Sequence, residues 1–319
     1  MRIGFYAAMK LDEKGVLKHE NTLQAPKEDR LKLLKEVRTN LSPIFGLFED
    51  KKGVVQSVLK KSLKRSPVMD FQAAGVRHRL YLEKNSGVIQ KISGVMKSKP
   101  MFIADGHHRF EVACQFKNWM RLQKNGKGHE WEYVLTYFSD CSHNPFEIFP
   151  THRLVRLAKG ADFRKILGRI GALEKAKDLK TVLSTLSQCR SKIKDKRYRF
   201  GLYSKSDGFW FLTLPGGATD KIGSSSVEVL DVSVLHKTIL NNLLNNQQTA
   251  EIDFTRDAND ACRKVKSGLF DLAVFLRPTS LEEMLSISKK GLKMPQKSTY
   301  FYPKLLTGLV FHGFENSNQ

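Results

Sequence analysis

Cysteine is scarce in this sequence, and no two cysteines lie close together. The 319 residues include four of them. None forms a Cys-x-x-Cys pair, so the usual spacing of a zinc knuckle is excluded and nothing indicates a disulfide framework. Isolated thiols are typical of a reducing compartment, and we therefore expect a cytoplasmic protein. The four positions are Cys114, Cys141, Cys189 and Cys262.

Long apolar runs are also missing. No stretch is long enough to cross a bilayer as a helix. The first residues do not combine a basic segment, an apolar stretch and a small-residue cleavage site, so we expect neither a secretory signal nor a membrane partner. Hydrophobic residues still make up 41% of the chain and aromatic residues 10%, which is the composition of a globular protein with a substantial core.

Acidic residues are few relative to basic ones. The chain has 54 Lys and Arg against 32 Asp and Glu, a formal net charge of +22. The excess is concentrated in Lys51–Arg65 and Lys175–Arg199. Such a balance is compatible with a nucleic-acid partner. Neither segment is interleaved with aromatic residues as a base-stacking platform would be, which favours a solvated basic surface and leaves nucleic acid as the alternative.

The most informative stretch begins at Met101. The apolar residues Met101–Ala104 predict a buried strand, and Asp105-Gly106 predicts a sharp corner. Val112 and Phe116 then recur at helical spacing. The sequence therefore predicts a strand, a glycine corner and the start of a helix.

His107, His108 and Arg109 fall in the first turn of that helix. A helix start presents backbone N–H groups to an anion, and a guanidinium group adds a fork of donors suited to phosphate. The alternative is structural, with Asp105 as the N-cap and His108 as a satisfied histidine. Basic side chains oppose the helix dipole at this end, which makes the purely structural interpretation less favourable.

The segment Met294–Lys304 is unusual because lysines, hydroxyl groups and aromatic side chains share one irregular run. One interpretation is a loop that lines a pocket, with Lys297 and Ser298 as anion ligands. The other is a C-terminal strand whose aromatic residues, Tyr300, Phe301 and Tyr302, pack on the core.

Alternating strand and helix patterns predict an α+β fold with mixed sheets and flanking helices. We expect one closely packed unit or two lobes, 1–150 and 151–319, with the C-terminal Lys-Ser-Thr loop, Lys297–Thr299, folding back toward Asp105. The individual predictions include a strand over Arg2–Leu11, a hairpin turn at Asp12–Gly15, a hairpin over Tyr198–Leu214, and helices over Lys51–Lys64, Asn85–Met96, Asp257–Lys266 and Ser280–Ser288.

Four stretches taken together resemble the bacterial and archaeal family catalogued as domain of unknown function 1015. They are His19-Glu20-x-Thr22 with Asp29-Arg30, Ala104–Arg109, Pro150–Arg153 and Met294–Lys304. The resemblance runs from Arg2 to about Leu309. The family usually carries a further N-terminal Pro-Tyr-Asp motif, so this chain resembles an N-terminally shortened member.

The central motif is also similar, more remotely, to the Gly-x-His-Arg signature of the ParB/sulfiredoxin-like fold. That superfamily includes chromosome-partitioning proteins and nucleotide-dependent enzymes such as a free-serine kinase, and there the motif binds phosphates at a helix start. The similarity implies a ParB/sulfiredoxin-like element here and a nucleotide-dependent phosphotransferase that acts on a small hydroxyl-bearing molecule, with ATP or ADP and magnesium.

On this hypothesis the candidate catalytic residues are Glu20, Asp105 and His108, because phosphoryl transfer needs a carboxylate to orient or deprotonate the acceptor. Asp29 is a weaker candidate. The candidate cofactor-binding residues offer backbone amides, cations or hydroxyl groups to phosphates. They are Gly106, His107, His108, Arg109, Thr151, His152, Arg153, Lys297, Ser298, Thr299 and Lys304.

Two other functions compete with this hypothesis. A nucleic-acid-associated binding protein without catalysis would explain the net charge. A metal-dependent hydrolase would use His19, His107, His108 and His152, but adjacent histidines on a helix point in different directions and no His-x-x-x-His spacing is present. We rank the hydrolase last and assign no metal-binding residues.

Overall fold

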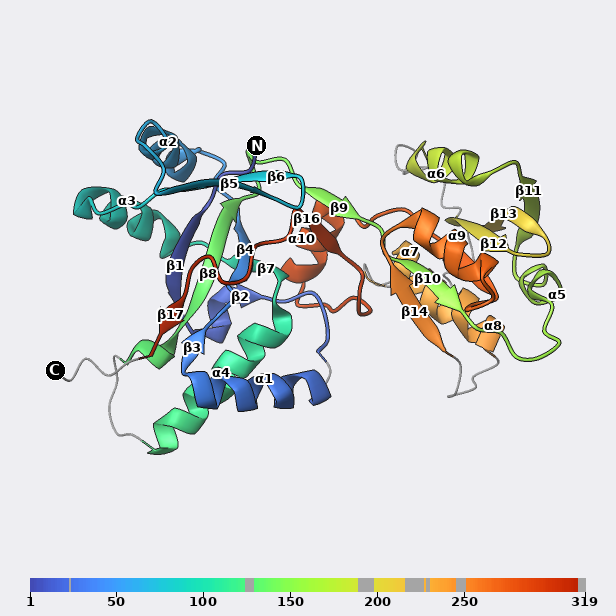
Figure 1. Cartoon of the computed structure of the whole chain (residues 1–319), viewed down its shortest axis with the longest axis horizontal. Coiled ribbons are helices and arrows are strands. Elements are labelled where there is room, and N and C mark those ends of the chain that lie inside the picture. The colour runs from blue at the N-terminus through green and yellow to red at the C-terminus, as the bar shows by residue number, and fades with distance from the viewer. Residues whose placement is uncertain are drawn as a thin grey trace. The chain divides into compact units, whose positions relative to one another are not determined.

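Two compact units make up the computed structural model of this chain (Figure 1). One comprises Met1–Glu147 and Phe301–Gln319, here called unit 1, and the other comprises Ile148–Tyr300, here called unit 2. Both combine helices with sheets, so the predicted α+β class is confirmed. The division into lobes 1–150 and 151–319 stays a prediction. The structure describes residues 1–22, 24–123, 129–188, 198–215, 227, 230–244 and 251–314.

Unit 1 contains a mixed five-stranded sheet. β4 and β8 run parallel, as do β2 and β7, whereas β1–β8 and β4–β7 are antiparallel. Every residue of the central strand β4 is buried, which explains its almost wholly apolar sequence. In spatial order the strands are β1 (Phe5–Lys10), β8 (Tyr133–Asp140), β4 (Ile44–Phe48), β7 (Met101–Asp105) and β2 (Val16–Leu17).

The predicted hairpin turn at Asp12–Gly15 is wrong. Glu13–Gly15 forms a short 3₁₀ turn, η1, that Asp12 caps through Lys14 N–H. The strands on either side do not pair, because β1 joins β8 and β2 joins β7. Leu11 and Val16 flank the turn, and both are buried in the same apolar core. Burial against distant strands therefore decides the path here, and turn chemistry alone does not.

The helices of unit 1 cover this sheet and pack on one another. Figure 1 shows α1 and α4 side by side, and these two helices are in contact. α4 carries two apolar stripes: Phe110 and Cys114 enter the core of the sheet, and Phe116 and Met120 enter a second cluster with Leu34 of α1. The helical elements are α1 (Gln24–Val37), α2 (Val54–Ser62), α3 (Ser86–Met96), α4 (His107–Gln123) and η2 (Glu130–Glu132).

Three short two-stranded sheets are also present among the residues that the structure describes. Phe301 in β16 is fully buried and packs on Phe45 and Phe146, with ring centroids 5.8 and 6.2 Å away. The interpretation in which the C-terminal aromatics pack on the core is therefore confirmed for Phe301. The pairs are β3 (Thr39–Asn40) with β17 (His312–Gly313), β5 (Met69–Ala73) with β6 (Val76–Leu80), and β9 (Glu147–Phe149) with β16 (Tyr300–Tyr302).

Unit 2 is built on an antiparallel six-stranded sheet. The predicted hairpin over Tyr198–Leu214 is present as β12 and β13. Helices α6 and α9 contribute Val182, Leu186 and Val265 to the main core of this unit. In spatial order the strands are β11 (Ala172–Ala176), β13 (Gly208–Leu214), β12 (Tyr198–Ser204), β15 (Leu272–Phe275), β10 (His152–Val155) and β14 (Ile252–Thr255).

The caps of two helices in unit 2 follow directly from the sequence. Asp257 accepts backbone hydrogen bonds at the start of α9, and Ser280 forms a capping box with Glu283 at the start of α10. Both helices were predicted within a residue of these caps. The helical elements are α5 (Phe163–Leu167), α6 (Leu179–Gln188), α7 (Asp231–Val234), the π-helical turn η5 (Leu235–Leu240), α8 (Asn241–Leu244), α9 (Ala258–Lys266) and α10 (Leu281–Lys289).

Candidate functional site

The predicted strand, corner and helix start are all present in unit 1. β7 ends at Asp105, and α4 begins at His107. Gly106 between them has φ +98°, a backbone conformation that side chains with a Cβ rarely adopt. A Cβ at this position would also lie 3.0 Å from Nε of Arg109. The corner therefore requires glycine for its backbone and for the space that the guanidinium group occupies.

Arg109 folds back over this corner. Its guanidinium group donates to Asp105 Oδ2 at 3.1 Å and to the carbonyl oxygen of Pro43. Burial lowers the pKa of Arg109 despite the opposing charge of Asp105, but a guanidinium group stays protonated in proteins. The side chain keeps 29% of its surface exposed. Arg109 is thus a positioned cation that solvent and ligands can still reach.

Lys304 reaches the same carboxylate from the C-terminal segment. Its Nζ lies 3.1 Å from Asp105 Oδ1, and the two side chains are 34% and 40% exposed. Asp105 therefore lies between two cations, one from α4 and one from a residue 199 positions later in the sequence. We call Asp105, Arg109 and Lys304 the corner cluster. Its formal charge is +1, and its groups are open to solvent at a helix start.

The first sequence motif contacts α4 at this end. The backbone N–H of His19 donates to His107 Nε2 at 3.4 Å, and the two rings meet edge to face at 4.6 Å. Both side chains are buried. His107 accepts at Nε2, so it serves here as an internal contact. His108, the next residue, is half-buried.

Glu111 makes a second contact between this motif and α4, and the sequence analysis did not include it. Thr22 Oγ1 donates to Glu111 Oε2 at 2.5 Å, and Lys18 and Lys27 lie 3.5 and 3.3 Å away. Burial acts to raise the pKa of Glu111, but the Thr22 hydrogen bond and the two lysines outweigh it and leave that pKa below its usual value. Glu111 is one turn beyond His107 on the same face, and this spacing is the signal that could have identified it. Glu20 belongs to the segment held by these contacts.

The remaining predicted residues lie in unit 2, and they are also joined to one another. Arg153 is fully buried in β10. It donates to the carbonyl oxygens of Thr151 and Lys297, and to His236 Nε2 at 3.2 Å. The guanidinium group also lies 5.2 Å from the Phe254 ring centre. Arg153 therefore joins two of the predicted motifs through internal contacts.

The neighbours of Arg153 are buried as well. Burial, with the charge of Arg153 as the second cause, lowers the pKa of His152 and of His236 to about 4. Both rings are thus neutral at pH 7. Ser298 is buried, with its carbonyl oxygen accepting from Thr279 at 3.2 Å, and Lys297 has φ +57°. Thr299 follows them before β16. His152, Arg153 and Ser298 are thus part of the interior of unit 2, whereas Lys297 is exposed.

No cluster of three or more His, Cys, Asp or Glu side chains is placed to hold a metal ion in the part of the chain that the structure describes. In that same part, no helix combines the length and the apolar character needed to cross a bilayer. The corner cluster has one carboxylate, that of Asp105, and this side chain is 40% exposed.

Residues 1–233 match a family described as protein of unknown function (DUF1015). The chain belongs to this family. The match covers the His19–Thr22, Ala104–Arg109 and Pro150–Arg153 motifs, whereas Met294–Lys304 lies beyond it. A search of curated proteins gives no match.

Several solved structures are similar at low sequence identity. A mutant form of a free serine kinase in complex with AMP has 14% identity and a TM-score of 0.47, over 94% of this chain and 88% of that chain. A conserved hypothetical protein from Pyrococcus furiosus has 14% identity and a TM-score of 0.47, over 96% and 94%. SbnI with a C-terminal truncation from Staphylococcus aureus has 11% identity and a TM-score of 0.49, over 95% and 85%. Similarity at this level carries no conclusion about the chemistry of this chain.

Proposed function

We propose that this protein is a nucleotide-dependent phosphotransferase that acts on a small hydroxyl-bearing molecule. The proposal assigns the phosphates of ATP or ADP to the β7–α4 corner, as in a ParB/sulfiredoxin-like element. The observation that carries it is the corner cluster, in which Arg109 and Lys304 flank Asp105 at the start of α4. Two accessible cations at a helix start match the charge and geometry of a polyphosphate.

Asp105 determines how the corner would respond to a ligand. Its two oxygens now accept from Arg109 and Lys304. A phosphate group carries more charge than a carboxylate and competes for the same cations. In the proposed complex the phosphate takes over these two contacts. The released carboxylate of Asp105 then becomes available as a ligand.

Magnesium fits this donor set. In nucleotide sites Mg²⁺ is typically held by one or two carboxylates together with the substrate phosphates. Asp105, with Glu20 as the second candidate, would hold it, and the ion would neutralise charge on the phosphates. The Glu20 carboxylate is proposed to orient and deprotonate the acceptor hydroxyl group, and His108 to carry a proton at its ring nitrogen.

For unit 2, the anion-binding role of Thr151–Arg153 and Lys297–Thr299 is a separate proposal. Lys297 supports it best, because it is exposed whereas Arg153 and Ser298 are buried. The substitution Lys297→Ala tests this role by titration with nucleotide. An unchanged nucleotide affinity would contradict it.

Thermal shift measurements with ATP and magnesium test the main proposal. We expect the native chain to be stabilised by several degrees at saturating nucleotide, and Arg109→Ala to lose most of that shift. Arg263→Ala is the matched control, because Arg263 is 76% exposed on α9 and pairs with a single carboxylate. Equal shifts in the native chain and Arg109→Ala, or no shift in either, would contradict the proposal.

The alternative function is a nucleic-acid-associated protein without catalysis. It is favoured by the segment Lys51–Arg65, which has six Lys or Arg residues and no Asp or Glu. Lys60, Lys61 and Lys64 are all exposed on or just after α2. Duplex DNA binding that weakens steeply with salt, in a chain that shows no nucleotide response, would select this alternative.

A further inference from the structure

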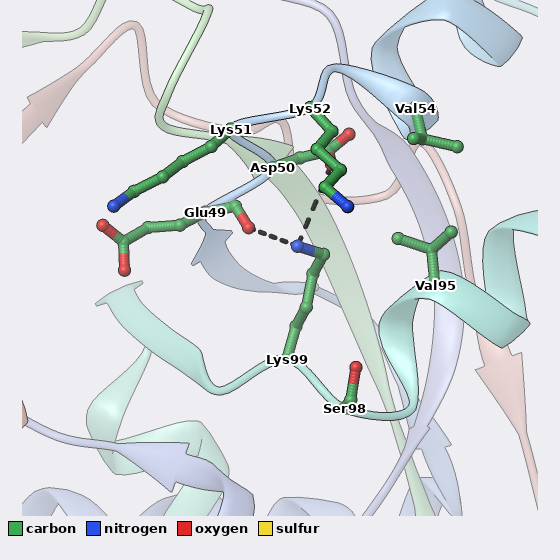
Figure 2. Close-up of a pocket in the computed structure, with 8 residues that line it drawn as sticks. All are labelled: Glu49, Asp50, Lys51, Lys52, Val54, Val95, Ser98 and Lys99. Carbon is green, nitrogen blue, oxygen red and sulfur yellow. Dashed lines mark hydrogen bonds and ion pairs between the residues drawn. The ribbon is translucent and has the colours of Figure 1, made fainter.

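A pocket of unit 1 lies away from the corner cluster. It has a volume of about 480 Å³ and lies between the segment after β4 and the segment before β7 (Figure 2). The corner cluster is at the opposite end of β7, a strand of five residues, so roughly 13 Å of strand separates the two places. The lining residues are Glu49, Asp50, Lys51, Lys52, Val54, Val95, Ser98 and Lys99.

Lys99 is held in place within this pocket. Its Nζ donates to the carbonyl oxygen of Glu49 at 2.6 Å and lies 3.8 Å from Asp50 Oδ1. Asp50 is itself fixed, because its Oδ2 accepts from Val55 N at 2.7 Å and its own N–H donates to Asp140 Oδ1 at 2.9 Å. Asp50 is only 2% exposed. The ammonium group of Lys99 is therefore positioned by buried contacts while its side chain remains 23% exposed.

Lys52 supplies a second cation. It is exposed and has no ion-pair or hydrogen-bond partner among the residues that the structure describes. Figure 2 shows its ammonium end directed to the side of the pocket where the ammonium group of Lys99 lies, whereas Lys51 points away, toward the Glu49 side chain. Two cations directed at one cavity repel each other, and an anion between them would attract both and offset that repulsion.

The rest of the lining limits what that anion can be. Val54 and Val95 form an apolar wall opposite the loop, and Ser98 adds a hydroxyl group. The pocket is within the size range of small-molecule sites. Three lysines face two carboxylates, of which that of Asp50 is already bonded to Val55 and lies beside Lys99. The lining therefore suits a compact anion that carries an apolar or hydroxyl-bearing part.

We propose that this pocket binds a small phosphate-bearing molecule, with its phosphate group between Lys52 and Lys99. Ser98 contributes a further donor, and Val54 and Val95 contact the remainder of the ligand. Phosphate is favoured over carboxylate because a dianion with several oxygens can satisfy two ammonium groups at once. The site is separate from the proposed nucleotide site and does not depend on it.

Calorimetric titration of the full chain with inorganic phosphate at low ionic strength tests this proposal. We expect Lys52→Ala to weaken phosphate binding about tenfold, the loss of one charge-assisted contact. Lys60→Ala is the matched control, since it removes the same charge from an exposed position of α2 outside the pocket. We expect it to change the affinity less than about twofold. Lys52→Arg should retain most of the binding.

Repeating the comparison in an Arg109→Ala background separates this pocket from the corner cluster, because the difference between the Lys52 and Lys60 variants should persist there. Lys99→Met provides a second test, with its thermal unfolding measured in parallel to verify folding. Absence of phosphate binding, equal losses in Lys52→Ala and Lys60→Ala, or binding of succinate as strong as that of phosphate would each overturn the proposal.

Discussion

Two His-Arg pairs in this chain have the same chemistry in sequence and opposite environments in structure. His108-Arg109 lies at the start of α4, where Arg109 pairs with Asp105 and stays partly exposed. His152-Arg153 lies in strand β10, where both side chains are buried and the imidazole is neutral at pH 7. On the proposed function, the first pair exchanges its partner for a ligand. The second is part of the internal contacts of its unit, so the same residue types would serve recognition in one place and stability in the other.

The largest expected effect comes from removing the buried arginine. Arg153→Ala would leave a cavity and would free the carbonyl oxygens of Thr151 and Lys297 from their donor. We expect it to lower the free energy of unfolding by about 3–5 kcal/mol. Arg109→Ala should cost only about 1 kcal/mol, because that ion pair is partly exposed. Urea denaturation of both variants measures the difference, and a larger loss in Arg109→Ala would reverse the comparison.

The second-largest effect is expected on lowering the pH, and it should arise around Arg153, where His152 and His236 are held neutral. Burial holds the pKa of His152 and His236 at about 4, below the ordinary value of 6.5. Between those values the unfolded chain binds protons that the folded chain does not, so stability falls as the pH is lowered from about 6.5 to 4. Each ring contributes at most about 3 kcal/mol, and less where their titrations are coupled.

The pH effect is measured by urea denaturation at pH 7 and pH 5, in the native chain and in His236→Gln. If the loss of stability is as large in the variant as in the native chain, His236 does not contribute to it. A loss that is smaller in the variant assigns part of the pH dependence to the environment of Arg153.

The difference between the two pairs also explains how far sequence reasoning reached. The corner was predictable because Asp105-Gly106, a strand before it and a helix after it are all local features. The burial of Arg153 was not, because it depends on β14 and β15 pairing on both sides of β10. Those strands lie about a hundred residues later in the chain, and no local pattern around Arg153 records their position.

The same distinction applies to the candidate site. Lys297 and Lys304 were predicted as alternative phosphate ligands, and of the two Lys304 forms an ion pair with Asp105. Glu111 was not identified, since its contacts with Thr22, Lys18 and Lys27 form only when α1 and the segment before it pack on α4. The failed hairpin at Asp12–Gly15 has the same cause, because distant strands determine the pairing there.

A more moderate effect is expected at the glycine of the corner. Gly106→Ala introduces a Cβ at φ +98° and 3.0 Å from the Arg109 guanidinium group. Gly160→Ala is the matched control, with φ +79° and no atom within 4 Å of the new Cβ. We expect Gly160→Ala to cost about 1 kcal/mol from backbone strain alone.

Gly106→Ala should cost about 2 kcal/mol, because crowding of Arg109 adds to the strain. Thermal unfolding measures both costs. Gly106→Ala should also displace Arg109 and reduce the response to nucleotide. Gly160→Ala should leave that response unchanged. Equal costs with equal nucleotide responses would mean that the space over Gly106 does not matter for the corner.

The smallest effect concerns the contact that holds the first motif on α4. Thr22→Val removes the hydroxyl group that donates to Glu111 at 2.5 Å and leaves the lysines Lys18 and Lys27 in place. We expect a loss of about 1–2 kcal/mol, since the acceptor is charged and partly buried. Ser42→Ala, which removes an exposed hydrogen bond to Thr307, should cost less than about 1 kcal/mol.

A double-mutant cycle of Thr22→Val with Glu111→Gln isolates this pair from other effects of each substitution. A coupling energy near zero would show that Thr22 and Glu111 do not stabilise each other. A clear coupling, together with a weaker nucleotide response in Thr22→Val, would link the segment that carries Glu20 to the corner cluster through α4. The corner cluster would then depend on the Thr22–Glu111 contact, as unit 2 is expected to depend on Arg153. The Thr22–Glu111 contact is partly exposed, so its removal should be tolerated.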